Sequence, residues 1–381
     1  MNGRLRFAIA AAGISAGMAL AGVSVSAADS GPGSGWGSPN LVFAQTNAAS
    51  GNQIVAYHQT GGALTFAGRY LTGGTGATAS GAVVDTLASQ GSLVYEATQR
   101  VLINVNAGSD SISVFGVFGN RLYLRQVLPS GGVFPDSVGV SGDLVYVLNA
   151  GGSGALQGYQ FEGGWLSPIP GSSRSLGLAN SDPPYYLDSP GQVGFSPSGR
   201  QLLVTTKASG SDIDVFQVEW NGELSASPVV NPSAQPVPFG FTFDNFGRLV
   251  VTEAGTSSVT TYSLAPDGSL NSIATLGDGE AALCWITEAD GYFYGANAGS
   301  NTLSGYRVGF NGSLSLLGDD GGIVASTGTG PIDLAAANGY LYSQAGGAGA
   351  IEEFRVNWDG SLTEVASVTG LGAGIEGLAT S

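Results

Sequence analysis

Residues 249–270 read LVVTEAGTSSVTTYSLAPDGSL, and this stretch decides the fold. An apolar strand ends at the polar residue Glu253, a turn of small residues follows, and a second strand alternates as far as Tyr262. The dipeptide Asp267-Gly268 then supplies the positive φ angles that reversing strands need. A further strand begins at Leu270. The pattern predicts short antiparallel strands joined by tight turns.

The same unit occurs seven times along the chain. The other copies cover residues 41–57, 101–115, 144–159, 202–216, 292–306 and 340–354. The polar residues that precede the turns are Asn47, Asn106, Asn149, Lys207, Glu253, Asn297 and Gln344. A new short strand restarts at residues such as Pro135, Pro190, Pro238 and Pro331, which gives four strands per unit. Units of four strands and about 40–50 residues are typical of β-propeller blades.

Seven units predict an all-β, seven-bladed propeller over residues 41–381. Residues 374–379, GIEGLA, match the restart strand PIDLAA at 331–336, but no strand pair follows them. We therefore expect the C-terminal strand to be the innermost strand of the blade whose outer strands begin at Leu41. Closure by both termini removes open sheet edges.

The first residues are typical of an export signal. Arg4 and Arg6 precede an apolar stretch over residues 7–25, and small residues suited to cleavage follow. We predict a signal peptide at 1–28, a Gly/Ser/Pro spacer at 29–40, and a secreted, monomeric mature protein. No other segment approaches the length of a membrane span.

The composition excludes several functions. The chain of 381 residues has 28 acidic and 12 basic residues, one His and one Cys, with a net charge of −16. Such a balance argues against nucleic acid and anionic ligands. One His and one Cys are too few for structural zinc or an intrachain disulfide.

The repeat resembles that of the lactonase-type seven-bladed propellers, the relatives of bacterial 6-phosphogluconolactonase and fungal carboxymuconate cyclase. Residues 193–218, VGFSPSGRQLLVTTKASGSDIDVFQV, and 239–262 carry the resemblance best. It implies hydrolysis or isomerisation of lactones or related cyclic esters, with Glu253 where the family has a glutamate at a strand end. Where family members often have histidines, this chain has Pro190-Gly191-Gln192, and the family's arginines near the site have no clear counterpart.

The polar residues before the turns are the first candidates for chemistry. We expect them around one rim of the central channel, where Asn106, Asn149 and Asn297 either bind a ligand or cap turns. Lys207 is the only lysine, and Glu253 lies in the neighbouring unit. Glu253 could activate water while Lys207 stabilises an oxyanion, or the two could form a rim salt bridge.

A second set of candidates lies two residues after each strand restart: Gly81, Ser137, Gln192, Gly240, Cys284, Asp333 and Glu376. Asp333 and Glu376 could support catalysis, bind calcium or magnesium, or accept hydrogen bonds from backbone amides. We expect no resident cofactor apart from such a divalent cation.

Two insertions lengthen the repeat. Residues 172–189 lie before an innermost strand and contain Tyr185 and Tyr186, a possible wall for an apolar or sugar-like ligand or a cover for blade edges. Residues 88–98 are expected to join the first two strands of their blade and so to lie on the opposite face. Two hypotheses follow: an exported lactone hydrolase or isomerase, and a non-catalytic extracellular propeller that binds a carbohydrate or a protein.

Overall fold

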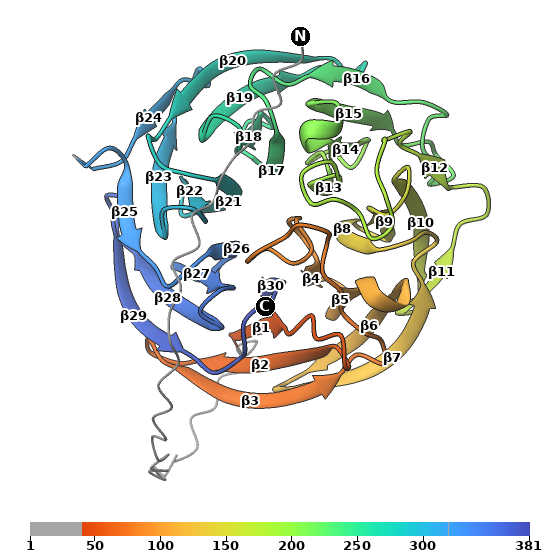
Figure 1. The fold of residues 1–381 in the computed structure, drawn as a ribbon, viewed down its shortest axis with the longest axis horizontal. Coiled ribbons are helices and arrows are strands. Elements are labelled where there is room, and N and C mark those ends of the chain that lie inside the picture. Colours follow the sequence, from red (N-terminus) through yellow and green to blue (C-terminus); the bar gives the residue numbers. More distant parts are fainter. Residues whose placement is uncertain (1–39, 319) are drawn as a thin grey trace. The chain divides into compact units, whose positions relative to one another are not determined.

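A computed structural model describes residues 40–318 and 320–381. Seven antiparallel sheets form the blades of a β-propeller, which confirms the predicted fold (Figure 1). The predicted signal peptide, residues 1–28, and the predicted spacer, residues 29–40, lie outside the described residues except for Asn40. In the part of the chain that the structure describes, no helix is long and apolar enough to cross a membrane.

The first four blades contain the following strands. Blade 1 has β30 (Leu378–Thr380), β1 (Leu41–Gln45), β2 (Gln53–Gln59) and β3 (Leu64–Leu71). Blade 2 has β4 (Leu93–Glu96), β5 (Val101–Asn106), β6 (Ser111–Phe118) and β7 (Arg121–Pro129). Blade 3 has β8 (Pro135–Ser141), β9 (Leu144–Asn149), β10 (Ala155–Glu162) and β11 (Trp165–Pro168), with β12 (Arg174–Ser175) beside β10. Blade 4 has β13 (Gln192–Phe195), β14 (Gln201–Thr205), β15 (Asp212–Gln217) and β16 (Val229–Pro232).

The remaining blades repeat this arrangement. Blade 5 has β17 (Pro238–Phe243), β18 (Leu249–Glu253), β19 (Ser258–Leu264) and β20 (Leu270–Gly277). Blade 6 has β21 (Leu283–Ala289), β22 (Tyr292–Asn297), β23 (Thr302–Val308) and β24 (Leu314–Leu316), with β25 (Ile323–Ser326) beside β23. Blade 7 has β26 (Pro331–Ala337), β27 (Tyr340–Ala345), β28 (Ala350–Val356) and β29 (Leu362–Val368). The 3₁₀ turns η1 (Ala107–Ser109) and η2 (Lys207–Ser209) follow β5 and β14.

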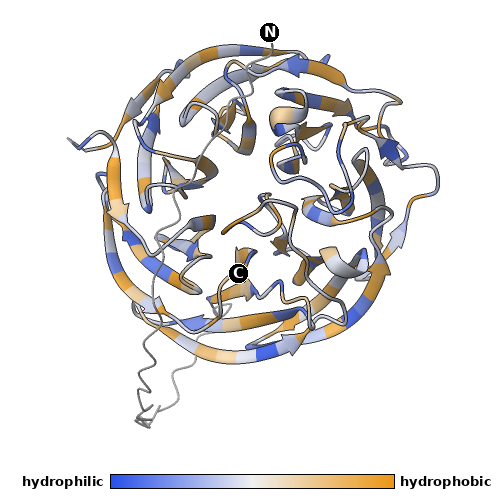
Figure 2. Cartoon of the chain, viewed as in Figure 1, coloured by the Kyte–Doolittle hydropathy of each residue, from blue (hydrophilic) through white to orange (hydrophobic). Residues whose placement is uncertain are grey.

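The strand order divides the propeller into two faces. Consecutive strands within a blade are antiparallel. The turns between second and third strands and the loops leading into the innermost strands therefore lie on one face, which we call the mouth face. The turns between first and second strands and between third and fourth strands lie on the other, which we call the hairpin face. Figure 2 shows apolar and polar positions interleaved along the strands.

The repeated turn on the mouth face connects each blade to the next one. Its last residue adopts a left-handed conformation, as at Asp110 (φ 49°), Ser211 (φ 56°), Ser257 (φ 46°) and Asn301 (φ 59°). Its carbonyl accepts a hydrogen bond from the chain that leaves the blade, for example from Ser130 N–H at 2.8 Å and from Thr327 N–H at 2.9 Å. Small and Asx residues recur here because they tolerate this conformation and this close approach.

The two ends of the described chain close the ring. β30 pairs with β1 through Val42↔Thr380 and Ala44↔Leu378, as predicted from the 374–379 match. Each innermost strand then contacts the innermost strand of both neighbouring blades. The sheet edge at β1 is therefore paired rather than open.

One expectation about an insertion is wrong. The innermost strand of blade 2 is β4, and Gly81 lies before it rather than in it. The long segment is therefore 72–92, which joins β3 to β4 and leads into an innermost strand. It lies on the mouth face, the same face as the 172–189 insertion, and not on the opposite face. The glycine-rich run at 73–81 contains no strand, so the sequence pattern placed the first strand of blade 2 too early in the chain.

The closure predicts a stability effect at Leu378, which is almost fully buried against blades 1 and 7. We expect Leu378→Ala to lower the free energy of unfolding by about 3 kcal/mol, because it leaves a cavity at the closing strand. Urea denaturation followed by circular dichroism measures the change. Val83→Ala, at an exposed apolar position, is the control and should change stability by less than about 0.5 kcal/mol. Equal effects of the two variants would contradict the role assigned to β30.

Candidate functional site

Residues 81–91, which we call the plug segment, cross the mouth of the central channel. Figure 1 shows this part of the β3–β4 connection in the middle of the ring. Leu87 N–H donates to Glu376 Oε2 at 2.5 Å, and Trp285 Nε1–H donates to Ser89 O at 3.0 Å. Ser89 Oγ donates to the Asp136 carbonyl at 2.7 Å. The plug segment is thus fastened to blades 1, 6 and 3.

The side chain of Gln90 bridges the plug segment to a strand. Its amide donates to Ile286 O at 2.9 Å and accepts from Ile286 N–H at 3.1 Å. Gln192 makes the same bridge from blade 4 to both backbone groups of Phe241 in blade 5, at 3.1 and 2.6 Å. The predicted binding residue Gln192 therefore joins two innermost strands.

Lys207 lies under the plug segment and is almost fully buried. Its Nζ donates to Ala88 O and Tyr186 O, each at 2.5 Å, and to Ser189 Oγ at 2.8 Å. The ammonium also lies 5.0 Å from the centre of the Phe239 ring. All three donors are in use, and they fasten the plug segment to the 172–189 insertion.

The Lys207 side chain reaches the plug segment because Lys207 lies one residue later in its turn than Asn106 does in blade 2. Asn106 pairs with Ser111 at the start of its turn, but the equivalent residue in blade 4 is Thr206, whose N–H and hydroxyl both bond Asp212 O. Lys207 is the next residue and is equivalent to Ala107, at the start of a 3₁₀ turn. Its side chain therefore points to the channel, whereas Asn106 points into its blade.

Four ionisable side chains surround the ammonium and define the candidate site: Asp85, Asp136, Cys284 and Glu376. Burial lowers the pKa of Lys207 to about 8, against the opposing effect of Asp85 and Asp136. Burial also raises the pKa of the Cys284 thiol, so it is a poor nucleophile at neutral pH. A single ammonium cannot offset three neighbouring carboxylates, of which Asp136 and Glu376 are fully buried, so burial favours protonation of some of the carboxyl groups.

Asp85 and Glu376 lie close together and affect each other's ionisation. Glu376 Oε2 accepts from Leu87 N–H and, at 2.8 Å, from Thr86 Oγ1, whereas Oε1 has no hydrogen-bond partner among the described residues. Burial and the negative charge of Asp85 raise the pKa of Glu376 well above its usual value. Burial also raises the pKa of Asp85, but the neighbouring Glu376 and Lys207 side chains oppose this rise. The protonated form is therefore favoured more strongly at Glu376 than at Asp85.

Asp136 is the most isolated of the carboxyl groups. It is fully buried at a bulge in β8, and neither carboxyl oxygen has a hydrogen-bond partner among the described residues. Burial raises its pKa well above the usual value, although the Lys207 charge opposes this. Burial without a hydrogen-bond partner therefore favours the protonated form of the Asp136 side chain.

Asp333 occupies the corresponding bulge in β26 and has a structural environment. Its carboxyl accepts from Leu334 N–H at 3.0 Å and from Leu378 N–H at 2.8 Å in the neighbouring blade. Burial raises its pKa to about 7. In the part of the chain that the structure describes, no group of three or more His, Cys, Asp or Glu side chains is placed to hold a metal ion. Binding of calcium or magnesium by Asp333 and Glu376 stays a prediction.

The structure places Glu253 away from Lys207, inside blade 5. Its Oε1 accepts from Ser233 Oγ, Gln235 N–H and Tyr262 Oη, and its Oε2 accepts from Ser258 Oγ and Thr260 Oγ1. The described residues include no hydrogen bond or ion pair between Glu253 and Lys207. The catalytic pair expected from the sequence is thus not assembled.

The three predicted binding asparagines are also turned into their blades and fully buried. Asn297 Nδ2 donates to Thr302 Oγ1 and Ser304 Oγ, at 3.1 and 2.8 Å. Asn106 Nδ2 bonds the equivalent Ser111 and Ser113, and Asn149 Nδ2 donates to the carbonyls of Ser130 and Ala155. Glu253 takes the same two hydroxyl partners five and seven residues further on. Asn106, Glu253 and Asn297 thus share one pattern, in which the polar residue of the repeat bonds hydroxyl groups of its own blade.

Tyr185 and Tyr186 do lie at the mouth. Their rings meet edge to face with centres 5.0 Å apart, and Tyr185 is 41% exposed. The backbone of the 172–189 insertion pairs with Ser80, the residue before the plug segment, because Ser80 N–H donates to Pro184 O and Tyr186 N–H to Ser80 O. A side chain at Gly81 would collide with the Tyr185 ring, at 2.9 Å. These aromatic rings therefore border the approach to the ionisable cluster.

Sequence reasoning missed Asp85 and Asp136. Asp85 lies between Gly81, which the sequence places in an innermost strand, and residues 88–98, which it places on the opposite face. Asp136 was passed over because the bulge in β8 displaces the inward-facing position by one residue relative to Ser137. A comparison of PD at 135–136 with PID at 331–333 is the one signal that could have found it.

The comparisons agree with this architecture. No family model matches the sequence, and no curated protein sequence is similar enough to count as a match. A candidate 6-phosphogluconolactonase from Bacteroides uniformis has a TM-score of 0.70 and 18% identity, over 90% of this chain and 99% of that chain. The periplasmic gluconolactonase of Pseudomonas aeruginosa has a TM-score of 0.68 and 16% identity, over 90% of this chain and 98% of that chain. At these identities the likeness shows the lactonase-type propeller fold.

The buried carboxyl of Asp333 predicts a pH dependence of stability. Its pKa rises from 3.8 to about 7 on folding, so the folded state keeps a proton that the unfolded state has released. Its contribution to stability is present below about pH 4 and is lost as the pH rises through about 7. We expect Asp333→Asn to flatten the fall in the free energy of unfolding over this window, by up to about 4 kcal/mol. Urea titrations at several pH values measure this, with the exposed Asp290→Asn as control. An unchanged slope in Asp333→Asn would contradict the assignment.

The buried lysine gives a second prediction. Lys207→Met removes the only positive charge in the cluster and leaves three acceptors unpaired, so we expect it to lower the free energy of unfolding by about 3–5 kcal/mol. Arg121→Met, at an exposed position on β7, should change it by less than about 0.5 kcal/mol. Denaturation at pH 7 measures both. A Lys207→Met protein as stable as the wild type would show that the ammonium does not hold the plug segment.

Proposed function

We propose that this protein is a lactone hydrolase whose reaction takes place at the channel mouth, on the neighbouring carboxyl groups of Asp85 and Glu376. The observation that carries the proposal is that Asp85, Glu376 and the buried Lys207 all bond the backbone of residues 87–88 at the channel mouth, which Tyr185 and Tyr186 border. Clusters of ionisable groups with strongly shifted pKa values are typical of active sites. The lactonase-type fold supports the same reaction class by analogy alone.

The chemistry assigns one role to each member of the pair. The Asp85 carboxylate takes a proton from water while the water oxygen adds to the lactone carbonyl carbon. The tetrahedral intermediate then expels the ring oxygen, which receives the proton that Asp85 took from water, and the product is a hydroxy acid. Glu376 affects the ionisation of Asp85 because its carboxyl lies nearby and bonds the adjacent Thr86 and Leu87. Asp85 is the partly exposed member, so substrate approaches from its side.

Lys207 is a positioning residue in this proposal. Its charge favours the ionised form of Asp85, and its hydrogen bonds hold the plug segment that carries Asp85. Its three donors are already bonded, so it does not bind the oxyanion in this conformation. Activation of water by Glu253, which the sequence suggests, has less support, because five donors surround its carboxylate inside blade 5.

We also propose that the mature protein is exported and that its substrate is an uncharged lactone. The residues typical of a signal peptide at 1–28 support export. The net charge of −16 disfavours phosphorylated substrates. N-terminal sequencing of the protein recovered from the culture medium or the periplasm would test both the cleavage and the location.

The enzymatic test is hydrolysis of a panel of neutral five- and six-membered lactones by the purified protein. We expect Asp85→Asn to lower kcat/KM by about 100-fold or more, because a general base typically contributes that much. Asn can still accept the Ala88 N–H bond that Asp85 Oδ1 accepts at 2.7 Å, so the plug segment keeps its capping bond. Glu376→Gln should shift the pH profile of kcat/KM.

Two variants are controls. Glu253→Gln should retain activity if its unfolding is unchanged, and the exposed Asp290→Asn should behave as the wild type. Loss of activity in Glu253→Gln but not in Asp85→Asn would move the chemistry to blade 5 and contradict the proposal.

The second candidate is a non-catalytic binding propeller, with ligand contacts at Tyr185 and Tyr186. The observation that favours it is that Lys207 and Glu253 have every donor or oxygen occupied by protein partners. Absence of turnover on every lactone, together with saturable sugar binding that Tyr185→Ala removes, would support this candidate over the hydrolase.

A further inference from the structure

Three turns on the hairpin face expose an aromatic side chain at the same position. They read WNGEL at 220–224, FNGSL at 310–314 and WDGSL at 358–362, and each joins the third and fourth strands of its blade. Trp220 is 96% exposed, Phe310 84% and Trp358 92%. A single exposed apolar residue needs no explanation, but three exposed aromatic side chains at one repeated position of the same face form a pattern.

The turns do not need these aromatic residues. In blade 5 the same turn reads PDGSL at 266–270, with Pro266 at the aromatic position. Ser269 N–H bonds Asp267 Oδ1 at 3.0 Å there, as Ser361 N–H bonds Asp359 Oδ1 at 3.0 Å beside Trp358. Since the same turn forms with proline at this position, the fold does not require the aromatic side chains.

The backbone under the aromatics is held firmly. The glycine carbonyl of each turn accepts a hydroxyl from the preceding blade: Gly222 from Tyr146 at 2.8 Å, Gly312 from Thr261 at 2.7 Å and Gly360 from Tyr294 at 2.9 Å. A rigid turn loses little conformational freedom when the side chain that it carries binds a ligand.

Polar groups flank the aromatic residue of blade 6. Phe310 meets Phe246 edge to face with centres 5.2 Å apart, and Phe246 is itself exposed. The Arg248 guanidinium stacks on Phe246 at 5.0 Å and bonds Asp244, Gly309 O and Phe310 O. These bonds use three of its five N–H groups, so two remain for a ligand.

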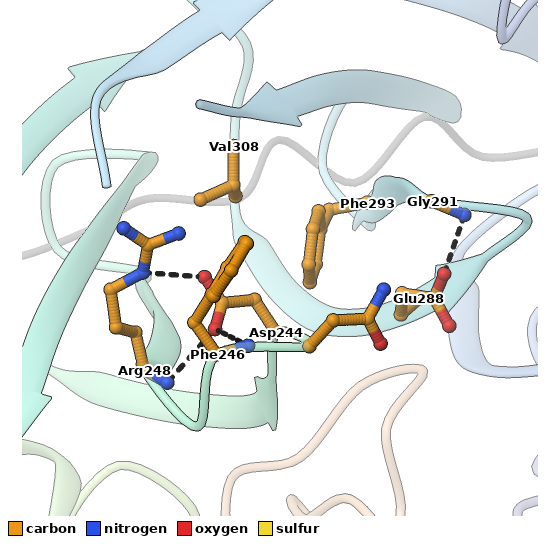
Figure 3. Close-up of a pocket in the computed structure, with 8 residues that line it drawn as sticks. Asp244, Phe246, Arg248, Glu288, Gly291, Phe293 and Val308 are labelled. Carbon is orange, nitrogen blue, oxygen red and sulfur yellow. Dashed lines mark hydrogen bonds and ion pairs between the residues drawn. The ribbon is translucent and has the colours of Figure 1, made fainter. Parts of the chain in front are cut away.

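A small cavity of about 60 Å³ opens beside these residues, between blades 5 and 6. Figure 3 shows Arg248 and Asp244 on one side of it and Phe293 and Glu288 on the other. The same combination recurs at the next junction, where Tyr292 Oη donates to Trp358 O at 2.8 Å and Arg307 stacks on the Tyr292 ring at 5.1 Å. Two neighbouring junctions thus each present aromatic surface beside a guanidinium.

The arrangement selects one class of ligand. The aromatic residues stand on separate turns divided by Asn, Asp, Gly and Ser, whereas a protein interface has a contiguous apolar core. The net charge of −16 repels anionic polymers and anionic bilayers. A sugar ring offers an apolar C–H face for an aromatic ring and hydroxyl groups for the flanking polar side chains. A polymer of such rings can also contact several turns at once.

We propose that the hairpin face binds a neutral polysaccharide, with Phe310 and Trp358 as adjacent stacking positions and Trp220 as a third. This surface is separate from the channel mouth and does not depend on the proposed hydrolysis. It differs from the sugar contact considered at Tyr185 and Tyr186, which lie on the mouth face.

The test measures retention of the full chain on insoluble neutral polysaccharides: cellulose, chitin, xylan and starch. We expect the wild type to bind at least one of them, and Phe310→Ala and Trp358→Ala each to weaken binding about five-fold or more. The triple variant with Trp220→Ala should weaken it about 50-fold or more, because linked weak contacts multiply. The melting temperature of each variant should stay within about 2 °C of the wild type, since the side chains are exposed.

Phe66→Ala is the matched control, because Phe66 is 61% exposed on β3 and belongs to none of the three turns. It should bind as the wild type does. The proposal is overturned if the wild type binds none of the four polysaccharides, or if the triple variant binds as well as the wild type. It is also overturned if the triple variant instead loses binding to phosphatidylcholine vesicles, or loses a dimer that the wild type forms, because the aromatics would then serve a membrane or self-association.

Discussion

The antiparallel pairing of β30 with β1 is the constraint on which the rest of this structure depends. Without it the inner edge of β1 would be open, and β26 and β4, the innermost strands of blades 7 and 2, would lose the strand that lies between them. With it, the innermost strands of all seven blades face one axis. Glu376 lies just before β30, so the segment that closes the ring also delivers a carboxyl group to the channel. Stability and the candidate chemistry therefore share the last few residues of the chain.

The position of the plug segment depends on this fixed geometry. Its backbone and the Gln90 side chain supply hydrogen bonds to strands that are far apart in sequence, which a flexible ring could not offer. Lys207 joins the plug segment to the 172–189 insertion through carbonyl groups rather than through an ion pair. The buried ammonium and the neighbouring carboxyls lower one another's cost of burial, so the cluster depends on all of its members.

The sequence predicted the blade number, the strand order and the closure, because each depends on a pattern that repeats seven times and tolerates small errors. The direction of a side chain, by contrast, is predicted wrongly when its position is wrong by a single residue. A bulge in β8 moves the inward-facing position from Ser137 to Asp136, and a one-residue shift sends Lys207 to the channel while Glu253 points into its blade. The glycine-rich start of the β3–β4 connection hid Asp85. These differences arise from local backbone geometry, which composition and periodicity do not encode.

The two faces of the propeller are made by different parts of the same repeat, and they are free to change independently. On the mouth face the turns and connecting loops hold neighbouring blades together, so a change there alters the register of the ring and the position of the cluster. On the hairpin face only the backbone of each turn is fixed, by a hydroxyl from the preceding blade. The occurrence of proline, phenylalanine and tryptophan at one position of that turn follows from this difference. A propeller can thus keep its closure and its channel while its hairpin face acquires an aromatic surface, which is why the lactonase-type fold by itself defines neither surface of this protein.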